Sequence, residues 1–165
     1  MKKLAISLIT FVLSLTGASR AQEAGSTYAI QNVQSEKNLR PYAAKTEDGN
    51  AIILYDHWSW KCMTWKFIQV ERNTYQLRNL YTGKTLQPSA GPVPQTALWQ
   101  QPLSGDKAQY WEFIRDRGDA YLIRLKGTRL YVTASSSETN SSIILLPMQN
   151  SSSQQWRLIK QDPWF

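Results

Sequence analysis

Side chains that could perform catalysis are few in this chain of 165 residues. His57 is its only histidine and Cys62 its only cysteine, so a zinc site built from several such ligands cannot be assembled. Asp56 directly precedes His57, and neighbouring side chains on a strand point to opposite faces, so we do not expect the two to pair. Carboxylate pairs for glycoside hydrolysis form only in space, and twelve acidic residues offer few of them. We therefore expect a binding protein without a cofactor, and not an enzyme.

The single cysteine also bears on stability. A chain with one thiol forms no internal disulfide, so its stability must come from packing. A free cysteine that is not reactive usually behaves as a small buried apolar residue. We therefore expect Cys62 to be buried and not to act as a nucleophile.

The N-terminus has the three parts of a secretory signal peptide. A basic start, MKK, precedes the apolar run LAISLITFVLSL (residues 4–15), and the small residues of TGASRA follow. The apolar run is too short for a membrane span. We predict a signal peptide at residues 1–21, cleaved after Ala21, and a short linker at residues 22–26. The expected product is a secreted or periplasmic protein without a membrane span.

The charge balance argues against nucleic acid as a partner. The whole chain carries 19 basic and 12 acidic residues, a net charge of +7. Loss of residues 1–21 removes Lys2, Lys3 and Arg20, which leaves 16 basic residues and a net charge of +4. These charges are scattered singly, whereas nucleic-acid binding requires a clustered basic face. We expect no nucleic-acid partner.

The remaining chain contains three copies of one pattern. A tryptophan recurs after 46 and then 45 residues, at Trp65, Trp111 and Trp156. A tyrosine that opens YAI, YQL and YLI recurs after 47 and 46 residues, and a leucine recurs after 47 and 44 residues. These two landmarks stand at Tyr28, Tyr75 and Tyr121, and at Leu39, Leu86 and Leu130. Three landmarks in the same order and at nearly the same spacing indicate a threefold repeat, over residues 27–73, 74–119 and 120–162.

Each copy has the pattern of short strands. Apolar and polar residues alternate around each tryptophan, which is typical of a half-buried strand, and turn-rich pieces such as YTGKT separate the strands. We count four strands per copy, twelve in total, and no amphipathic helix. A propeller typically needs four to eight blades and a solenoid needs capping units, so three such units are expected to close on each other. The result would be an all-β barrel with a hairpin lid, pseudo-threefold symmetry and the three tryptophans in its core.

The tryptophan motif resembles a known family. Copies two and three end in QYW and QQW, whereas copy one has MTW, with Met63 in place of glutamine. Together with YQLRNLYTGKTLQP (residues 75–88) and GNAIILYDH (residues 49–57), this pattern resembles the ricin B-type β-trefoil lectins over residues 27–162. The resemblance implies a β-trefoil domain at residues 27–165 that binds carbohydrate, with the repeated tryptophans in a structural role.

The resemblance also implies where sugar would bind. In this family an aromatic platform follows the third strand of a copy, and an acidic residue follows the leucine of the second strand. The platform position falls on Tyr55, Trp99 and Leu146, and the acid position falls on Arg40, Gln87 and Tyr131. No copy keeps the acid, and the asparagine that the family has before its QxW tryptophan is replaced by Cys62, Ala108 and Ser153.

Copy two is expected to hold the best site, with Trp99 as the platform and Gln87 and Gln101 as hydrogen-bonding groups. The indole would cover the C–H face of a sugar ring. Packing of the ring within the lid is an equally weighted alternative for this residue.

Copy one is expected to hold a second site, with Tyr55 as the platform and Arg40, Asp56 and His57 nearby. A guanidinium suits a carboxylate or a sulfate, so an acidic glycan is the ligand expected there. Lid packing is again the alternative role of the ring. Copy three lacks an aromatic residue at this position and is not expected to bind sugar.

Two functions remain open. The first is a secreted, non-catalytic, carbohydrate-binding module whose partner is a glycan or glycoconjugate, which the aromatic residues favour. The second is a protein-interaction trefoil subunit, toxin-associated or inhibitor-like, with degenerate sugar sites, which the missing acid and asparagine favour.

Overall fold

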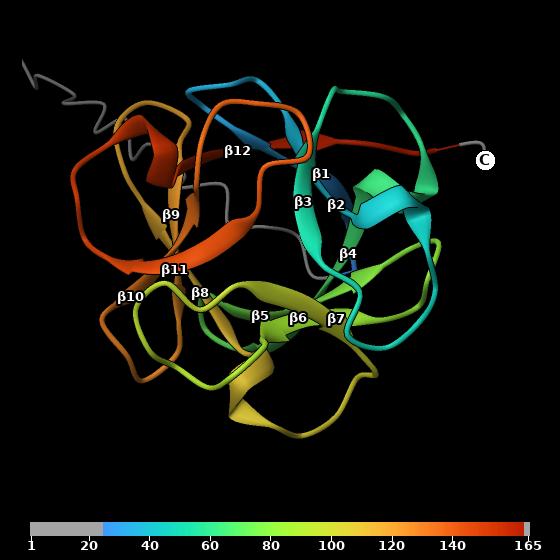
Figure 1. Cartoon of the computed structure of the whole chain (residues 1–165), viewed down its shortest axis with the longest axis horizontal. Coiled ribbons are helices and arrows are strands. Elements are labelled where there is room, and N and C mark those ends of the chain that lie inside the picture. Colours follow the sequence, from blue (N-terminus) through green and yellow to red (C-terminus); the bar gives the residue numbers. More distant parts are fainter. Residues whose placement is uncertain (1–24, 164–165) are drawn as a thin grey trace, which may run out of the picture.

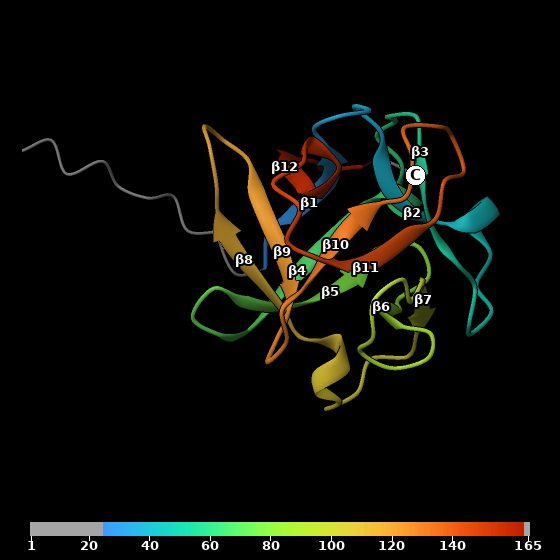
Figure 2. The same ribbon diagram turned by 60° about the vertical axis from the view of Figure 1, so that its left-hand side comes forward.

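The computed structural model describes residues 25–163 (Figures 1 and 2). The signal peptide predicted at residues 1–21 and most of the predicted linker lie outside the described residues, so cleavage after Ala21 stays a prediction. Within residues 25–163, no helix reaches the length and apolarity that a membrane crossing requires.

Each copy contributes four strands, twelve in total over the described residues, as predicted. Copy one contains β1 (Thr27–Asn32), β2 (Asn38–Pro41), β3 (Ile52–Tyr55) and β4 (Thr64–Glu71). Copy two contains β5 (Thr74–Asn79), β6 (Thr85–Pro88), β7 (Leu98–Gln101) and β8 (Trp111–Arg115). Copy three contains β9 (Tyr121–Leu125), β10 (Leu130–Ala134), β11 (Ile143–Pro147) and β12 (Gln155–Lys160). Single 3₁₀ turns lie at η1 (Tyr42–Ala44), η2 (Lys61–Met63), η3 (Lys107–Gln109) and η4 (Ser152–Gln154).

The first and fourth strands of the three copies form a closed antiparallel barrel. The strand order is β1, β4, β5, β8, β9 and β12, and β12 pairs back onto β1. The remaining hairpins, β2–β3, β6–β7 and β10–β11, surround the centre in Figure 1 and touch one another through three single bridges. Closure leaves the barrel strands without an exposed edge. This is the β-trefoil arrangement, so the predicted fold is confirmed.

The repeated tryptophans lie in the core, which confirms their structural role. Trp65, Trp111 and Trp156 have 0% exposure. Each indole Nε1 donates to a backbone carbonyl of the second strand of its own copy: to Leu39 at 3.1 Å, Leu86 at 3.3 Å and Val132 at 3.0 Å. Burial of a large aromatic side chain contributes a few kcal/mol, and the bond satisfies its one polar group.

These bonds correct the alignment of copy three. Val132, and not Leu130, is the counterpart of Leu39 and Leu86. A slip of two residues keeps every side chain on the same face of a strand, so the alternating pattern could not distinguish the two choices. The corrected spacings are 47 and 46 residues.

The lid bridges correct the alignment of copy two in the same way. Trp99 pairs with Ala51, as Ile144 pairs with Ala97 and Ile53 pairs with Ser142. Trp99 is therefore the counterpart of Ile53 and Ile144, and Gln101 is the counterpart of Tyr55 and Leu146. The predicted alignment of copy two was wrong because Gln100 is polar and yet is buried where the other copies have Leu54 and Leu145.

Candidate functional site

The three residues predicted for copy two lie on one face of the β6–β7 hairpin. Gln87 is directly opposite Trp99, and Gln101 is two residues further along β7. Paired residues share a face of a sheet, and so do residues two apart on one strand. Trp99 is 39% exposed, and both glutamines are partly exposed. We call Trp99, Gln87 and Gln101 the copy-two surface.

Gln109, the glutamine of QYW, fixes one edge of the copy-two surface. Its Nε2 donates to Gln87 Oε1 at 2.9 Å and to the Pro102 carbonyl at 2.9 Å. Its Oε1 accepts from Gln76 Nε2 at 3.0 Å and from the Ser104 backbone at 2.9 Å. Because the Gln87 oxygen is engaged, its amide hydrogens are the donors left for a ligand. The motif indicated the family but did not reveal this positioning role.

The indole of Trp99 rests on the lid of copy one. A Cβ at Gly49 would lie 3.5 Å from Trp99 Cε3, and the backbone there has a φ of +76°, which glycine adopts without strain. Gln100, beneath the ring on the opposite face of β7, donates through Nε2 to the Lys45 and Glu47 carbonyls at 2.8 and 2.7 Å. Trp99 therefore packs within the lid and also keeps an exposed surface.

Copy one brings Arg40 and Tyr55 together. The guanidinium carbon lies 3.9 Å from the centre of the Tyr55 ring. Arg40 lies opposite Ile53 on the β2–β3 hairpin, and Asn38 lies opposite Tyr55, so all four side chains share the outer face. The platform predicted at Tyr55 is thus covered on one side by a cation of the same chain.

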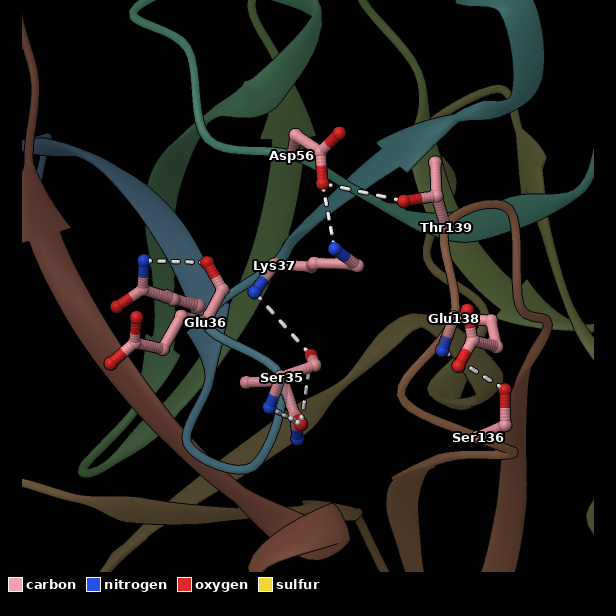
Figure 3. A network of polar contacts seen from close by, with 9 residues as sticks. Ser35, Glu36, Lys37, Asp56, Ser136, Glu138 and Thr139 are labelled. Carbon is pink, nitrogen blue, oxygen red and sulfur yellow. Dashed lines mark hydrogen bonds and ion pairs between the residues drawn. The ribbon is translucent and has the colours of Figure 1, made fainter.

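Asp56 and His57 make separate contacts. The Asp56 carboxylate accepts from Lys37 Nζ at 2.7 Å and from Thr139 Oγ1 at 3.3 Å, which joins copy one to copy three (Figure 3). The hydrogen bond from Lys37 lowers the pKa of the Asp56 carboxyl. Asn38 Nδ2 donates to His57 Nδ1 at 2.7 Å. Within residues 25–163, no hydrogen bond or ion pair joins either residue to Arg40.

Copy three repeats the scaffold without an aromatic platform. Gln154 Nε2 donates to Thr133 Oγ1 at 3.0 Å, as Gln109 does to Gln87. Thr133, and not Tyr131, therefore occupies the position predicted for the acid, and Tyr131 is buried. The reason is the same slip of two residues that misplaced Leu130.

Residues 25–163 contain few side chains suited to metal binding or to nucleophilic attack. No group of three or more histidine, cysteine, aspartate or glutamate side chains gathers there in a way that could hold a metal. Cys62 is buried, as predicted, and burial raises the pKa of its thiol above the ordinary value, which disfavours the nucleophilic thiolate.

Comparisons with known proteins agree with this geometry. A family model described as "Ricin-type beta-trefoil lectin domain-like" matches residues 61–146, just over half of the chain. None of the curated protein sequences gives a significant match.

Several solved structures are similar at low identity. ThreeFoil, a designed three-fold symmetric protein, is 21% identical with a TM-score of 0.78, covering 81% of this chain and 98% of ThreeFoil. The ricin B-like lectin of Macrolepiota procera, solved with lactose, is 21% identical with a TM-score of 0.73, covering 83% and 96%. The exo-β-1,3-galactanase 1,3Gal43A of Clostridium thermocellum is 18% identical with a TM-score of 0.78, covering 82% of this chain and 30% of the enzyme. At these identities the likeness shows the fold alone.

Proposed function

Because the chain belongs to the ricin-type β-trefoil lectin domain-like family, we propose that it is a carbohydrate-binding module whose main sugar site is the copy-two surface. One observation carries the proposal: an indole with 39% exposure stands opposite a glutamine whose amide is fixed by Gln109. The similar lectin of Macrolepiota procera was solved with lactose, which supports a sugar as the ligand class.

The chemistry of the copy-two surface suits a neutral sugar. A flat indole covers the C–H face of a pyranose ring, and amide groups exchange hydrogen bonds with hydroxyls. Neither glutamine carries a charge. A shallow site of one ring and two amides is expected to bind weakly, with a Kd of about 1 mM, or about 4 kcal/mol. Avidity from a second site would raise the apparent affinity.

The module is proposed to be non-catalytic and exported. An indole and two amides cannot exchange protons at neutral pH, so the copy-two surface has no general acid or base. The apolar run at residues 4–15 behind a basic start supports export to the periplasm or the medium. N-terminal sequencing of the exported protein tests this directly: the first residue should be Gln22, and retention of residues 1–21 would contradict it.

The test of the sugar site is a glycan array probed with the wild-type protein, Trp99→Ala and Tyr81→Ala. Tyr81 is a matched control because it is an aromatic residue, 56% exposed, on the β5–β6 turn. Loss of the indole should weaken binding at least tenfold, about 1.4 kcal/mol, while Tyr81→Ala binds as the wild type does. Circular dichroism confirms that both variants fold. Unchanged binding by a folded Trp99→Ala protein would refute the site.

A protein-interaction subunit is the second candidate. The observation that favours it is the absence of an acidic residue at Arg40, Gln87 and Thr133, the three positions at which the family's acid is expected. Under this alternative, no glycan on the array binds, and a defined protein partner instead binds at the exposed Trp99 ring. Glycan binding that depends on Trp99 excludes it as the main function of this surface.

A further inference from the structure

The outer face of the β2–β3 hairpin contains a buried cation that has no acceptor among residues 25–163. Arg40 is the one charged residue in the buried class between residues 25 and 163, with 8% exposure. Its Nε has no hydrogen-bond partner, and the five ion pairs of the described chain all involve other residues. A buried charge normally has a partner, because removal of an ion from water costs several kcal/mol.

A difference between the copies explains why Arg40 lacks a partner. In copies two and three, a glutamine donates to the residue at the position of Arg40, in the bonds Gln109 to Gln87 and Gln154 to Thr133. Copy one has Met63 there, fully buried, which can make no such bond. In copy one, the side chain at position 40 is therefore not joined to the glutamine that holds its counterparts in copies two and three.

The Tyr55 ring orients the guanidinium but does not satisfy it. With the carbon 3.9 Å from the ring centre, the contact is a cation–π interaction, which contributes about 2 kcal/mol when it is desolvated. A ring face has no oxygen to accept the five N–H groups of an arginine. These groups are arranged as a fork that matches the two oxygens of a carboxylate or a sulfate.

No acidic side chain of the described chain takes this place. Asp56, at the end of the same hairpin, is held by Lys37 and Thr139 (Figure 3). The nearest polar neighbour on the face, Asn38, donates to His57 and leaves its own buried Oδ1 without a donor. Two polar groups two residues apart on β2 are thus unsatisfied, one a donor and one an acceptor.

We propose that copy one is an anion site, in which Arg40, oriented by Tyr55, binds the carboxylate or sulfate of an acidic glycan. This rests on the proposed carbohydrate-binding function and assigns the two copies different ligands: copy two a neutral sugar face, copy one a charged substituent. Copy three has neither an aromatic platform nor a cation at these positions.

An NMR titration that follows the Arg40 Nε–H resonance tests the site. The probes are galactose, galacturonate, galactose 6-sulfate and inorganic sulfate, each at constant ionic strength. Galacturonate or galactose 6-sulfate should shift the resonance saturably, at least tenfold more tightly than galactose does. The two acidic probes distinguish a carboxylate from a sulfate source. Equal shifts by galactose, no saturable shift by either acidic sugar, or equally tight binding of inorganic sulfate would overturn the assignment to an acidic glycan.

Two variants separate this site from the copy-two surface. Arg40→Lys keeps the positive charge but loses the fork, and it should lose acidic-sugar binding at least tenfold while Trp99-dependent binding remains. Trp99→Ala should show the reverse. If an acidic sugar binds Arg40→Lys as tightly as it binds the wild type, the anion site alone is refuted. If glycan binding is the same in Trp99→Ala as in the wild type, the proposed function of the copy-two surface alone is refuted. The amide spectrum of each variant reports that it folds.

Discussion

Replacement of Arg40 with methionine should stabilise the unliganded protein. The change removes a cation that is 8% exposed and has no ion-pair partner among residues 25–163. An uncompensated buried charge costs about 3–5 kcal/mol, and the lost contact with Tyr55 returns about 2 kcal/mol of that. Methionine is flexible enough to fill the space against the ring. The expected net gain is about 1–3 kcal/mol, or about 3–9 °C in Tm for a domain of this size.

The assay is thermal unfolding, followed by circular dichroism in a buffer without sulfate or phosphate. Such anions would bind the folded wild type at Arg40 and raise its Tm by mass action. Arg129→Met is the matched control, because Arg129 is exposed and its change should alter stability by less than about 0.5 kcal/mol. A lower Tm for Arg40→Met than for the control would show that the guanidinium is already well satisfied, and would refute the reasoning behind the anion site.

Two substitutions and one chemical modification test the scaffold. Gln109→Met copies the Met63 of copy one and removes four hydrogen bonds. It should lower the free energy of unfolding, measured in urea, by about 2–4 kcal/mol and weaken Trp99-dependent binding. Unchanged stability would contradict the positioning role of Gln109. Gly49→Ala places a Cβ at a φ of +76° and should cost about 1–2 kcal/mol in the same urea assay, and no loss would mean that the loop adjusts freely. Because burial raises the pKa of the Cys62 thiol, iodoacetamide should react with it far more slowly in the folded protein than in urea, and equal alkylation rates would contradict this. The free energy of unfolding should also fall as the pH rises through the ordinary thiol range, because the unfolded thiol ionises first.

The fold could be predicted because two separate signals in the sequence agree. The spacing of Trp65, Trp111 and Trp156 gave the number of copies, and the alternation around each gave strands. Three units of four short strands have few ways to bury their apolar faces, so the closed barrel followed. Burial of a large aromatic residue at a symmetric position is a local requirement of each copy, which is why sequence reasoning succeeds there.

The alignment of the lid strands could not be predicted in full. Leu130 and Val132 lie on the same face of β10, so a shift of two residues leaves the pattern unchanged. Gln100 is buried because its amide holds the Lys45 and Glu47 carbonyls of another copy, a contact that only the fold creates. Sequence reasoning therefore named the residues of the copy-two surface but gave Trp99 the position that belongs to Gln101.

The roles of the repeated glutamines and of Arg40 were also beyond the sequence. Gln109 and Gln154 appear in the motif only as neighbours of a tryptophan, and their amide groups donate to residues 7 to 22 positions away in the chain. The notable property of Arg40 is that it has no hydrogen-bond or ion-pair partner among residues 25–163, which depends on where Asp56, Lys37 and Met63 lie in space. An unsatisfied group becomes visible only when every possible partner has been placed.

The most direct measurement of sugar binding follows the indole N–H resonances of the tryptophans by NMR while a glycan selected on the array is added. The Trp99 indole should shift saturably with the same Kd as the binding itself, and the buried indoles of Trp65, Trp111 and Trp156 should stay in place. A glycan that binds without moving the Trp99 resonance, or an array on which no glycan binds, would contradict the assignment of this surface as a sugar site.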